Sequence, residues 1–107
     1  MNLSQKKCID CRLGIKLSDD KISEYKALIS SDWIIRDSKL FCHCKFSDFK
    51  SAKIFVDKIA ELAESEGHHP NILMHGWNKV RLEFYTHAIS GLSENDFIMA
   101  AKVSALG

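Results

Sequence analysis

Apolar residues recur at intervals of three and four near the start of the chain, which predicts an α-helix there. The first helix is expected from Leu17 to Ser30. Ser18 is its expected cap, and the two aspartates that follow suit the positive end of the helix dipole. The last helix is expected after Ser93, because Ser93 and Asp96 have the spacing of a capping box.

A stronger helical pattern runs from 47 to 67, in the segment SDFKSAKIFVDKIAELAESEG. Ser47 is its expected cap. Gly67 is expected to end it in the left-handed conformation, which glycine adopts without strain. The apolar positions form one broad stripe, so this helix is expected to bury a face. The stripe consists of Phe49, Ala52, Phe55, Val56, Ile59, Ala60, Leu62 and Ala63.

Between the helices, apolar and polar residues alternate, as in half-buried β-strands. WIIRD and KLFCHCKF predict a hairpin around Asp37-Ser38, and NILMH and KVRLEFYTH predict a second hairpin around Gly76-Trp77-Asn78. In each returning strand, alternate residues are expected to share one apolar face. These residues are Leu40, Cys42, Cys44 and Phe46 in the first hairpin, and Val80, Leu82 and Phe84 in the second.

The expected order of elements is α-β-β-α-β-β-α. Hairpins imply antiparallel pairing, and helices packed on a four-stranded antiparallel sheet give an α+β fold. Residues 1–16 show no clear period, which is compatible with a loosely ordered N-terminal extension before a single domain over 17–107. Such a sheet has two edges, and a small sheet often covers an edge by pairing in a dimer.

Composition narrows the function classes. Lys plus Arg is 15 and Asp plus Glu is 14 in 107 residues, a formal net charge of +1. This balance argues against a general nucleic-acid or membrane binder, which needs a basic surplus. The chain shows no apolar run of about 18 residues and no apolar export signal after its start, so no membrane contact and a cytoplasmic location are expected.

The four cysteines fall as Cys8-x2-Cys11 and Cys42-x-Cys44. The first pair has the spacing of a zinc knuckle, but the second does not repeat it. Both thiols of the second pair fall on the apolar face of their strand, where reduced cysteine packs as a small hydrophobe. A site with four thiolates, or one built from three histidines, is the alternative; no metal site is the expectation.

Histidines are the candidates for chemistry. His68 and His69 follow the end of the long helix, and His87 closes the last strand on its polar face. Imidazole titrates near neutral pH, so these residues with Asp96 would make an acid–base site if the fold brings them together. The alternative is structural: a solvated helix end, Pro70 as a helix stop, and Asp96 as a cap alone.

Trp33 and Trp77 are expected to pack in the core or in an interface, although an aromatic side chain can also stack on a flat ligand. The sequence contains no glycine-rich phosphate loop, no G-x-S-x-G and no dinucleotide fingerprint.

At these histidines the sequence resembles the pterin-4a-carbinolamine dehydratases. The family pattern has a charged residue shortly before His-His-Pro, then an aromatic residue, a further histidine and an aspartate. Here the same order is given by Glu64, His68-His69-Pro70, Trp77, His87 and Asp96. The phrases SDWIIRDSKLFCHCKFSDFKSAKIFVDKIAELAE and GWNKVRLEFYTHAISGLSENDF also resemble the family, so the likeness covers roughly residues 17 to 104.

The resemblance implies a sheet with its helices on one face, assembled as a homodimer through sheet edges or as a homotetramer. It implies dehydration of 4a-hydroxytetrahydrobiopterin, a pterin-4a-carbinolamine, to quinonoid dihydropterin. This reaction recycles tetrahydrobiopterin for aromatic amino-acid hydroxylases, which are the implied partners, and needs no metal or organic cofactor. A second hypothesis keeps the fold as a non-catalytic pterin-binding or partner-binding module.

The resemblance also implies roles for residues. His68 and His87 would do the acid–base work, His69 would hold the pterin and assist, and Asp96 would orient or charge-stabilise a histidine. The implied catalytic set is therefore His68, His69, His87 and Asp96, and the implied substrate-binding set is His69, Pro70 and Trp77.

Overall fold

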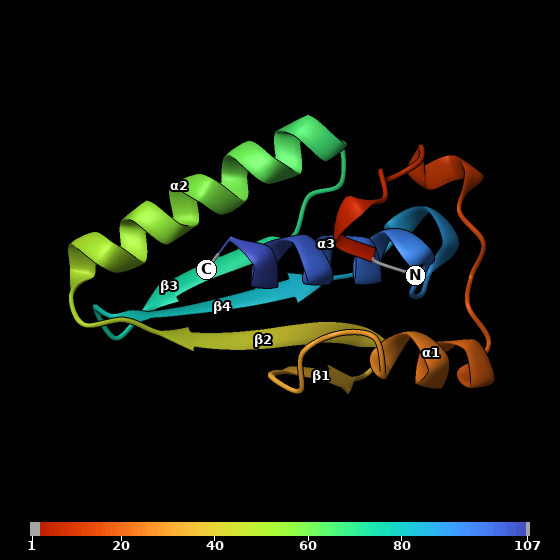
Figure 1. The fold of residues 1–107 in the computed structure, drawn as a ribbon, viewed down its shortest axis with the longest axis horizontal. Helices are drawn as coiled ribbons and strands as arrows, with labels where there is room; N and C mark the ends of the chain where they lie inside the picture. The colour runs from red at the N-terminus through yellow and green to blue at the C-terminus, as the bar shows by residue number, and fades with distance from the viewer. Residues whose placement is uncertain (1–2, 107) are drawn as a thin grey trace.

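The fold is a single antiparallel sheet with two long helices on one side (Figure 1). The computed structural model describes residues 3–106, with Cys11 described by its backbone alone. The elements are α1 (Asp19–Lys26), β1 (Trp33–Arg36), β2 (Lys39–Lys45), α2 (Phe49–Glu66), β3 (Asn71–His75), β4 (Lys79–Phe84) and α3 (Glu94–Ala105). This order and the helices on one face confirm the predicted α+β class.

The four strands are arranged in the order β1-β2-β4-β3. Both predicted hairpins are present, and β2 and β4 pair between them, with Leu40 opposite Phe84 and Cys42 opposite Leu82. The first hairpin turns at Asp37 and Ser38, whose φ angles of 53° and 61° match the twist that tight hairpins need. β1 and β3 are therefore the two edge strands.

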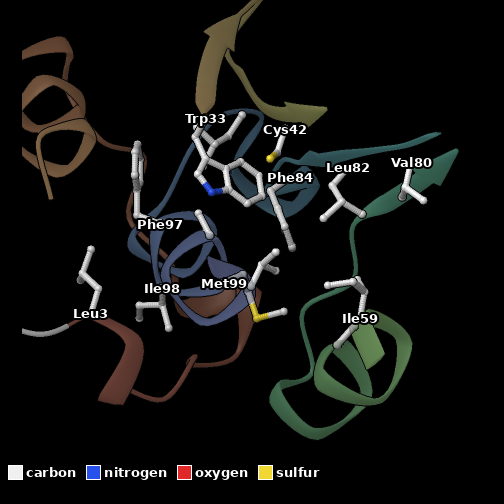
Figure 2. Packing of buried hydrophobic residues seen from close by; sticks show 14 of the residues in the cluster. Leu3, Trp33, Cys42, Ile59, Val80, Leu82, Phe84, Phe97, Ile98 and Met99 are labelled. Atoms are coloured by element: carbon white, nitrogen blue, oxygen red, sulfur yellow. The ribbon is translucent and has the colours of Figure 1, made fainter. Parts of the chain in front are cut away.

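The core lies between the inner face of the sheet and α2 and α3 (Figure 2). The alternation predicted for β2 and β4 is confirmed, because Leu40, Val80, Leu82 and Phe84 are buried while Cys44 and Phe46 are half-buried. Trp33 is also buried, as expected. Its indole Nε1 donates to Ser104 Oγ at 3.3 Å, which satisfies the polar atom of an otherwise apolar ring.

The cap of α2 differs from the prediction. Asp48, not Ser47, is the capping residue, and its Oδ1 accepts a hydrogen bond from the Ser51 N–H at 2.7 Å. Both residues are good caps, and the choice depends on where the chain leaves β2. At the other end Gly67 adopts φ 68°, as predicted, and its N–H donates to the Ala63 carbonyl. Ala52, Ile59 and Ala63 bury the inner stripe, whereas Phe49 and Ala60 at its margins are exposed.

Replacing Gly67 with alanine is expected to lower the free energy of unfolding by about 1 kcal/mol, because an L-residue is strained at this positive φ. An added Cβ would meet nothing within 4 Å, so backbone strain is isolated from steric clash. Urea denaturation measures the change. Ala60→Gly is the reverse substitution on the exposed side of the same helix, and it measures the exchange of these two residues where the backbone has ordinary helical angles. An unchanged urea midpoint in Gly67→Ala would contradict the prediction.

α1 is shorter than the predicted span of 17–30. Ser18 caps it as expected, accepting from the Lys21 N–H at 3.3 Å, but the helix ends at Lys26. After that residue the chain forms tighter turns, such as the bond from the Leu28 N–H to the Tyr25 carbonyl. No residue of α1 is fully buried, so packing does little to extend the helix. Its main anchor is Tyr25, whose ring stacks on Phe97 at 5.5 Å between centroids.

Residues 3–13, here called the N-terminal strap, lie along α3 (red to orange in Figure 1). The strap contains two short 3-10 helices, η1 (Leu3–Gln5) and η2 (Cys11–Leu13). Leu3 is buried in the core, and Lys102 Nζ donates to the Ser4 carbonyl at 2.8 Å. Residues 3–13 show no periodic pattern in the sequence, because contacts made through backbone groups leave no periodic signal.

Candidate active site

A buried ion-pair geometry joins the C-terminal end of α2 to the N-terminal end of α3. His68 follows the left-handed Gly67, which turns the chain so that the imidazole points toward the core. Its Nε2 lies 2.7 Å from Asp96 Oδ1. The His68 side chain is 3% exposed and that of Asp96 is 0% exposed. The imidazole also stacks on Phe84, with 6.1 Å between ring centroids and 13° between planes.

Both carboxylate oxygens of Asp96 are hydrogen-bonded to neighbouring groups. Its Oδ2 accepts from Thr86 Oγ1 at 2.8 Å and from the Ser93 N–H at 2.9 Å. The bond from Ser93 confirms the predicted capping contact, so Asp96 both caps α3 and holds His68. A carboxylate in its ionised form only accepts hydrogen bonds, so His68 Nε2 would be the donor to it. The bond holds the imidazole in one orientation.

His69 is exposed, unlike its neighbour. Its Nε2 lies 2.7 Å from Glu64 Oε1, and the two side chains are 59% and 79% exposed. A pair this open to water contributes little to stability. It does keep the imidazole of His69 at the surface, next to the buried His68, with the half-buried Pro70 leading into β3.

The sequence predicted that His87 closes the last strand, but the structure places it after that strand has ended. β4 ends at Phe84, and His87 begins the 3-10 turn η3 (His87–Ile89). The cause is a local backbone pairing between Thr86 and Gly91, which bends the chain before the histidine. The His87 ring is exposed and meets Tyr85 edge-on at 4.8 Å. Because Thr86 bonds Asp96, the residue next to His87 is tied to the His68–Asp96 pair.

Trp77 lies apart from this cluster. β3 carries the chain away from His68 and Pro70, the turn contains Trp77, and β4 returns it to Thr86 (Figure 1). The turn with Trp77 lies roughly 15 Å from the opposite, open end of the hairpin, at about 3.3 Å per strand residue. Trp77 is 62% exposed, so it is not the core residue that was one expectation for it.

Thr86 is the member of the cluster that the sequence analysis missed. It precedes His87, and nothing in its local pattern distinguishes it from other strand residues. Ser93 was found through its capping spacing. Among the residues that the structure describes, every buried side-chain nitrogen or oxygen has a hydrogen-bond partner. The cluster therefore contains no unsatisfied polar side-chain atom.

Cys42 and Cys44 pack in or against the core, whereas Cys8 lies beside α3, with its Sγ 3.8 Å from the Asn95 carbonyl oxygen. Among the described residues, no group of three or more His, Cys, Asp or Glu side chains is arranged to hold a metal ion. Cys42 and Cys44 have their Sγ atoms 3.7 Å apart on the inner face of β2. The contact with the Cys44 thiol and burial raise the pKa of Cys42, which disfavours its thiolate. The Cys11 side chain lies outside the described part of the structure.

Comparison with known proteins identifies the family of the chain. The family model described as pterin 4 alpha carbinolamine dehydratase matches residues 15–106. The chain belongs to the pterin-4a-carbinolamine dehydratase family. The motif residues quoted above, from Glu64 to Asp96, all fall inside the matched region.

Several relatives of the chain carry the name of this dehydratase family. A protein of Alkaliphilus metalliredigens (strain QYMF) named for the family is 47% identical over 104 residues, covering 95% of this chain and 93% of the relative. Pterin-4-alpha-carbinolamine dehydratase 2, mitochondrial, of Arabidopsis thaliana is 36% identical, covering 98% and 59% of the two chains. These names support a dehydratase that acts on a pterin carbinolamine.

Solved structures of the pterin dehydratase type show the same fold. The transcriptional coactivator/pterin dehydratase from Brucella Melitensis superimposes with a TM-score of 0.79 at 29% identity, covering 86% of this chain and 98% of that one. A pterin dehydratase-like protein identified as a RuBisCO assembly factor in the alpha-carboxysome has a TM-score of 0.57 at 29% identity, covering 69% and 84%. Within residues 3–106, no helix is long and apolar enough to cross a membrane.

Proposed function

We propose that this chain dehydrates a 4a-hydroxytetrahydropterin, such as 4a-hydroxytetrahydrobiopterin, to the quinonoid dihydropterin by histidine acid–base catalysis. The observation that carries the proposal is the buried His68–Asp96 hydrogen bond of 2.7 Å, with His69 next in the chain and His87 adjoining Thr86. In tetrahydrobiopterin recycling the product would be reduced and used again by an aromatic amino-acid hydroxylase. The reduced thiols of Cys42 and Cys44 favour a reducing compartment, such as the cytoplasm, for this role.

The reaction removes one molecule of water. The C4a–O bond breaks as the leaving hydroxyl gains a proton, the N5–H bond gives up a proton, and its electron pair forms the C4a=N5 double bond. Two imidazoles near neutral pH suit these two transfers, because one can donate while another accepts. His68 and His87 take these parts in the proposal.

The other residues support the transfers. Asp96 holds His68 in one orientation, as a buried carboxylate does for the histidine of a catalytic triad. His69, at the surface beside it, would contact the pterin ring, and Pro70 fixes the direction in which the chain leaves the site. Trp77 would contact substrate only from a second copy of the chain, since its own turn lies at the far end of the hairpin. Homodimers or homotetramers formed at the edges β1 and β3 would allow this.

The decisive measurement is the decay of freshly generated 4a-hydroxytetrahydropterin, followed by absorbance with and without the protein. The uncatalysed reaction gives the baseline. We expect acceleration that a chelator does not reduce, because the proposed transfers use side chains alone. If well-folded protein produces no acceleration, the dehydratase proposal is wrong, and the alternative of a pterin-binding or partner-binding module is favoured.

A further inference from the structure

The N-terminal strap contacts α2, α3 and η3, which carry or adjoin the candidate catalytic residues. The Cys8 N–H donates to Glu66 Oε1 at 2.9 Å, at the end of α2 and two residues before His68. Lys6 Nζ lies 3.0 Å from Glu94 Oε2 at the start of α3. Further along the strap, η2 contacts η3, which begins with His87. In Figure 1 the strap crosses beside α3 and the adjoining blue turn.

Asn95 binds the strap at two points. The Ile9 N–H donates to Asn95 Oδ1 at 3.0 Å, and Asn95 Nδ2 donates to the Ile9 carbonyl at 2.8 Å. Asn95 is 2% exposed, and it immediately precedes Asp96. The amide oxygen and the amide nitrogen of a buried side chain thus both bond the backbone of one strap residue, which fixes the position of that residue against α3.

The contacts of the strap and the His68–Asp96 bond join the same two parts of the fold. That bond links the end of α2 to the start of α3, across 28 residues of sequence. The strap links the same two helix ends, because adjacent residues Cys8 and Ile9 bond Glu66 on one side and Asn95 on the other. Glu66 also lies 3.9 Å from Lys102 of α3, with both side chains largely buried. A second set of bonds therefore joins α2 to α3, in addition to the bond between His68 and Asp96.

We infer that Asn95 and Glu66 are positioning residues of the dehydratase, which act through the N-terminal strap to hold His68 and Asp96 in register. The inference rests on the proposed function. Neither side chain needs to touch substrate. Each fixes a helix end, and small displacements of a catalytic group are costly because proton transfer needs hydrogen-bond distance and alignment. The strap is thereby part of the catalytic unit, although it lies wholly outside residues 15–106, which the family model matches.

Four variants test this. Asn95→Ala and Glu66→Ala remove the two anchors, and Glu66→Gln keeps an oxygen that can accept from the Cys8 N–H. Asn78→Ala is the matched control. Asn78 is 5% exposed, and its Nδ2 donates to the Phe46 carbonyl at 2.9 Å, but it lies in the β3–β4 turn, at the far end of the hairpin from His68, His69 and His87. It therefore reports the general cost of deleting a buried amide.

We expect Asn95→Ala and Glu66→Ala to lower kcat about tenfold with KM changed less than about twofold, the result of misplaced catalytic groups rather than lost substrate contacts. Glu66→Gln should recover most of kcat. Asn78→Ala should lower the melting temperature and leave kcat unchanged. The inference is overturned if both alanine variants at the anchors keep the wild-type kcat, or if Asn78→Ala loses as much. Should Asn95→Ala not fold, the Glu66 pair of variants decides.

A second measurement separates this inference from the proposed function. Long-range ¹H–¹⁵N spectra of the imidazoles report the tautomer and hydrogen bonding of His68 without any substrate. The His68 signals should shift in Asn95→Ala and Glu66→Ala, and stay unchanged in Asn78→Ala. If the wild-type protein does not accelerate the dehydration, the proposed function fails, while these spectra still decide whether the strap positions His68. Unchanged His68 signals in both anchor variants would overturn the inference.

Discussion

Replacing His68 with glutamine is expected to slow the dehydration of 4a-hydroxytetrahydropterin by at least about a hundredfold while the protein stays folded. Positioned acid–base groups contribute about 10²–10⁴ in rate, and glutamine cannot transfer a proton near neutral pH. The amide of glutamine can reach where the imidazole Nε2 lies and donate to Asp96 Oδ1, which now accepts at 2.7 Å. The buried carboxylate therefore keeps a partner, and the loss of rate reports chemistry.

The assay compares the enzyme-dependent excess rate of the two proteins at saturating substrate. His43→Gln is a matched control, because His43 is exposed on the outer face of β2 and lies opposite Arg81, not Asp96. That variant should keep its rate. Wild-type activity in His68→Gln would show that His68 only packs and caps the helix junction. The acid–base roles would then have to be sought at His87 and His69.

Replacing Asp96 with alanine is expected to have the largest effect on stability, a loss of about 3–5 kcal/mol in the free energy of unfolding. The substitution removes the carboxylate that bonds His68 Nε2, Thr86 Oγ1 and the Ser93 N–H, although Thr86 Oγ1 keeps a second partner, Ser93 Oγ at 2.8 Å. All three groups are buried, so water does not easily replace the carboxylate, and each unsatisfied donor costs free energy. Loss of the cap on α3 adds to the effect.

Urea denaturation followed by circular dichroism measures this loss. Asp57→Ala is the control, since Asp57 pairs with Lys53 on the exposed side of α2 and should change stability little. Asp96→Asn, which keeps one acceptor oxygen, should fall between the wild type and Asp96→Ala. A loss below about 1 kcal/mol in Asp96→Ala would mean that His68, Thr86 and Ser93 find other partners, contrary to the buried network described here.

Local patterns in the sequence were sufficient for the elements and their faces. Alternation placed Val80, Leu82 and Phe84 on the buried face, and glycine chemistry placed the end of α2 at Gly67. The patterns failed where two adjacent residues are equally good helix caps, as with Ser47 and Asp48. They also failed where tertiary pairing bends the chain, as with Thr86 and Gly91 before His87. In both cases the deciding contact is not periodic.

The sequence by itself determined the α+β class, the two hairpins, the capping spacing of Ser93 and Asp96, and the family through its ordered histidines. Only the tertiary structure decided that His68 is buried against Asp96 while His69 is exposed, and that Trp77 lies at the far end of the hairpin. It also decided that the strap joins the helix ends. The reason is physical. Periodicity records which face of an element is buried, whereas a hydrogen bond between distant residues depends on how whole elements pack and leaves no trace in either local pattern.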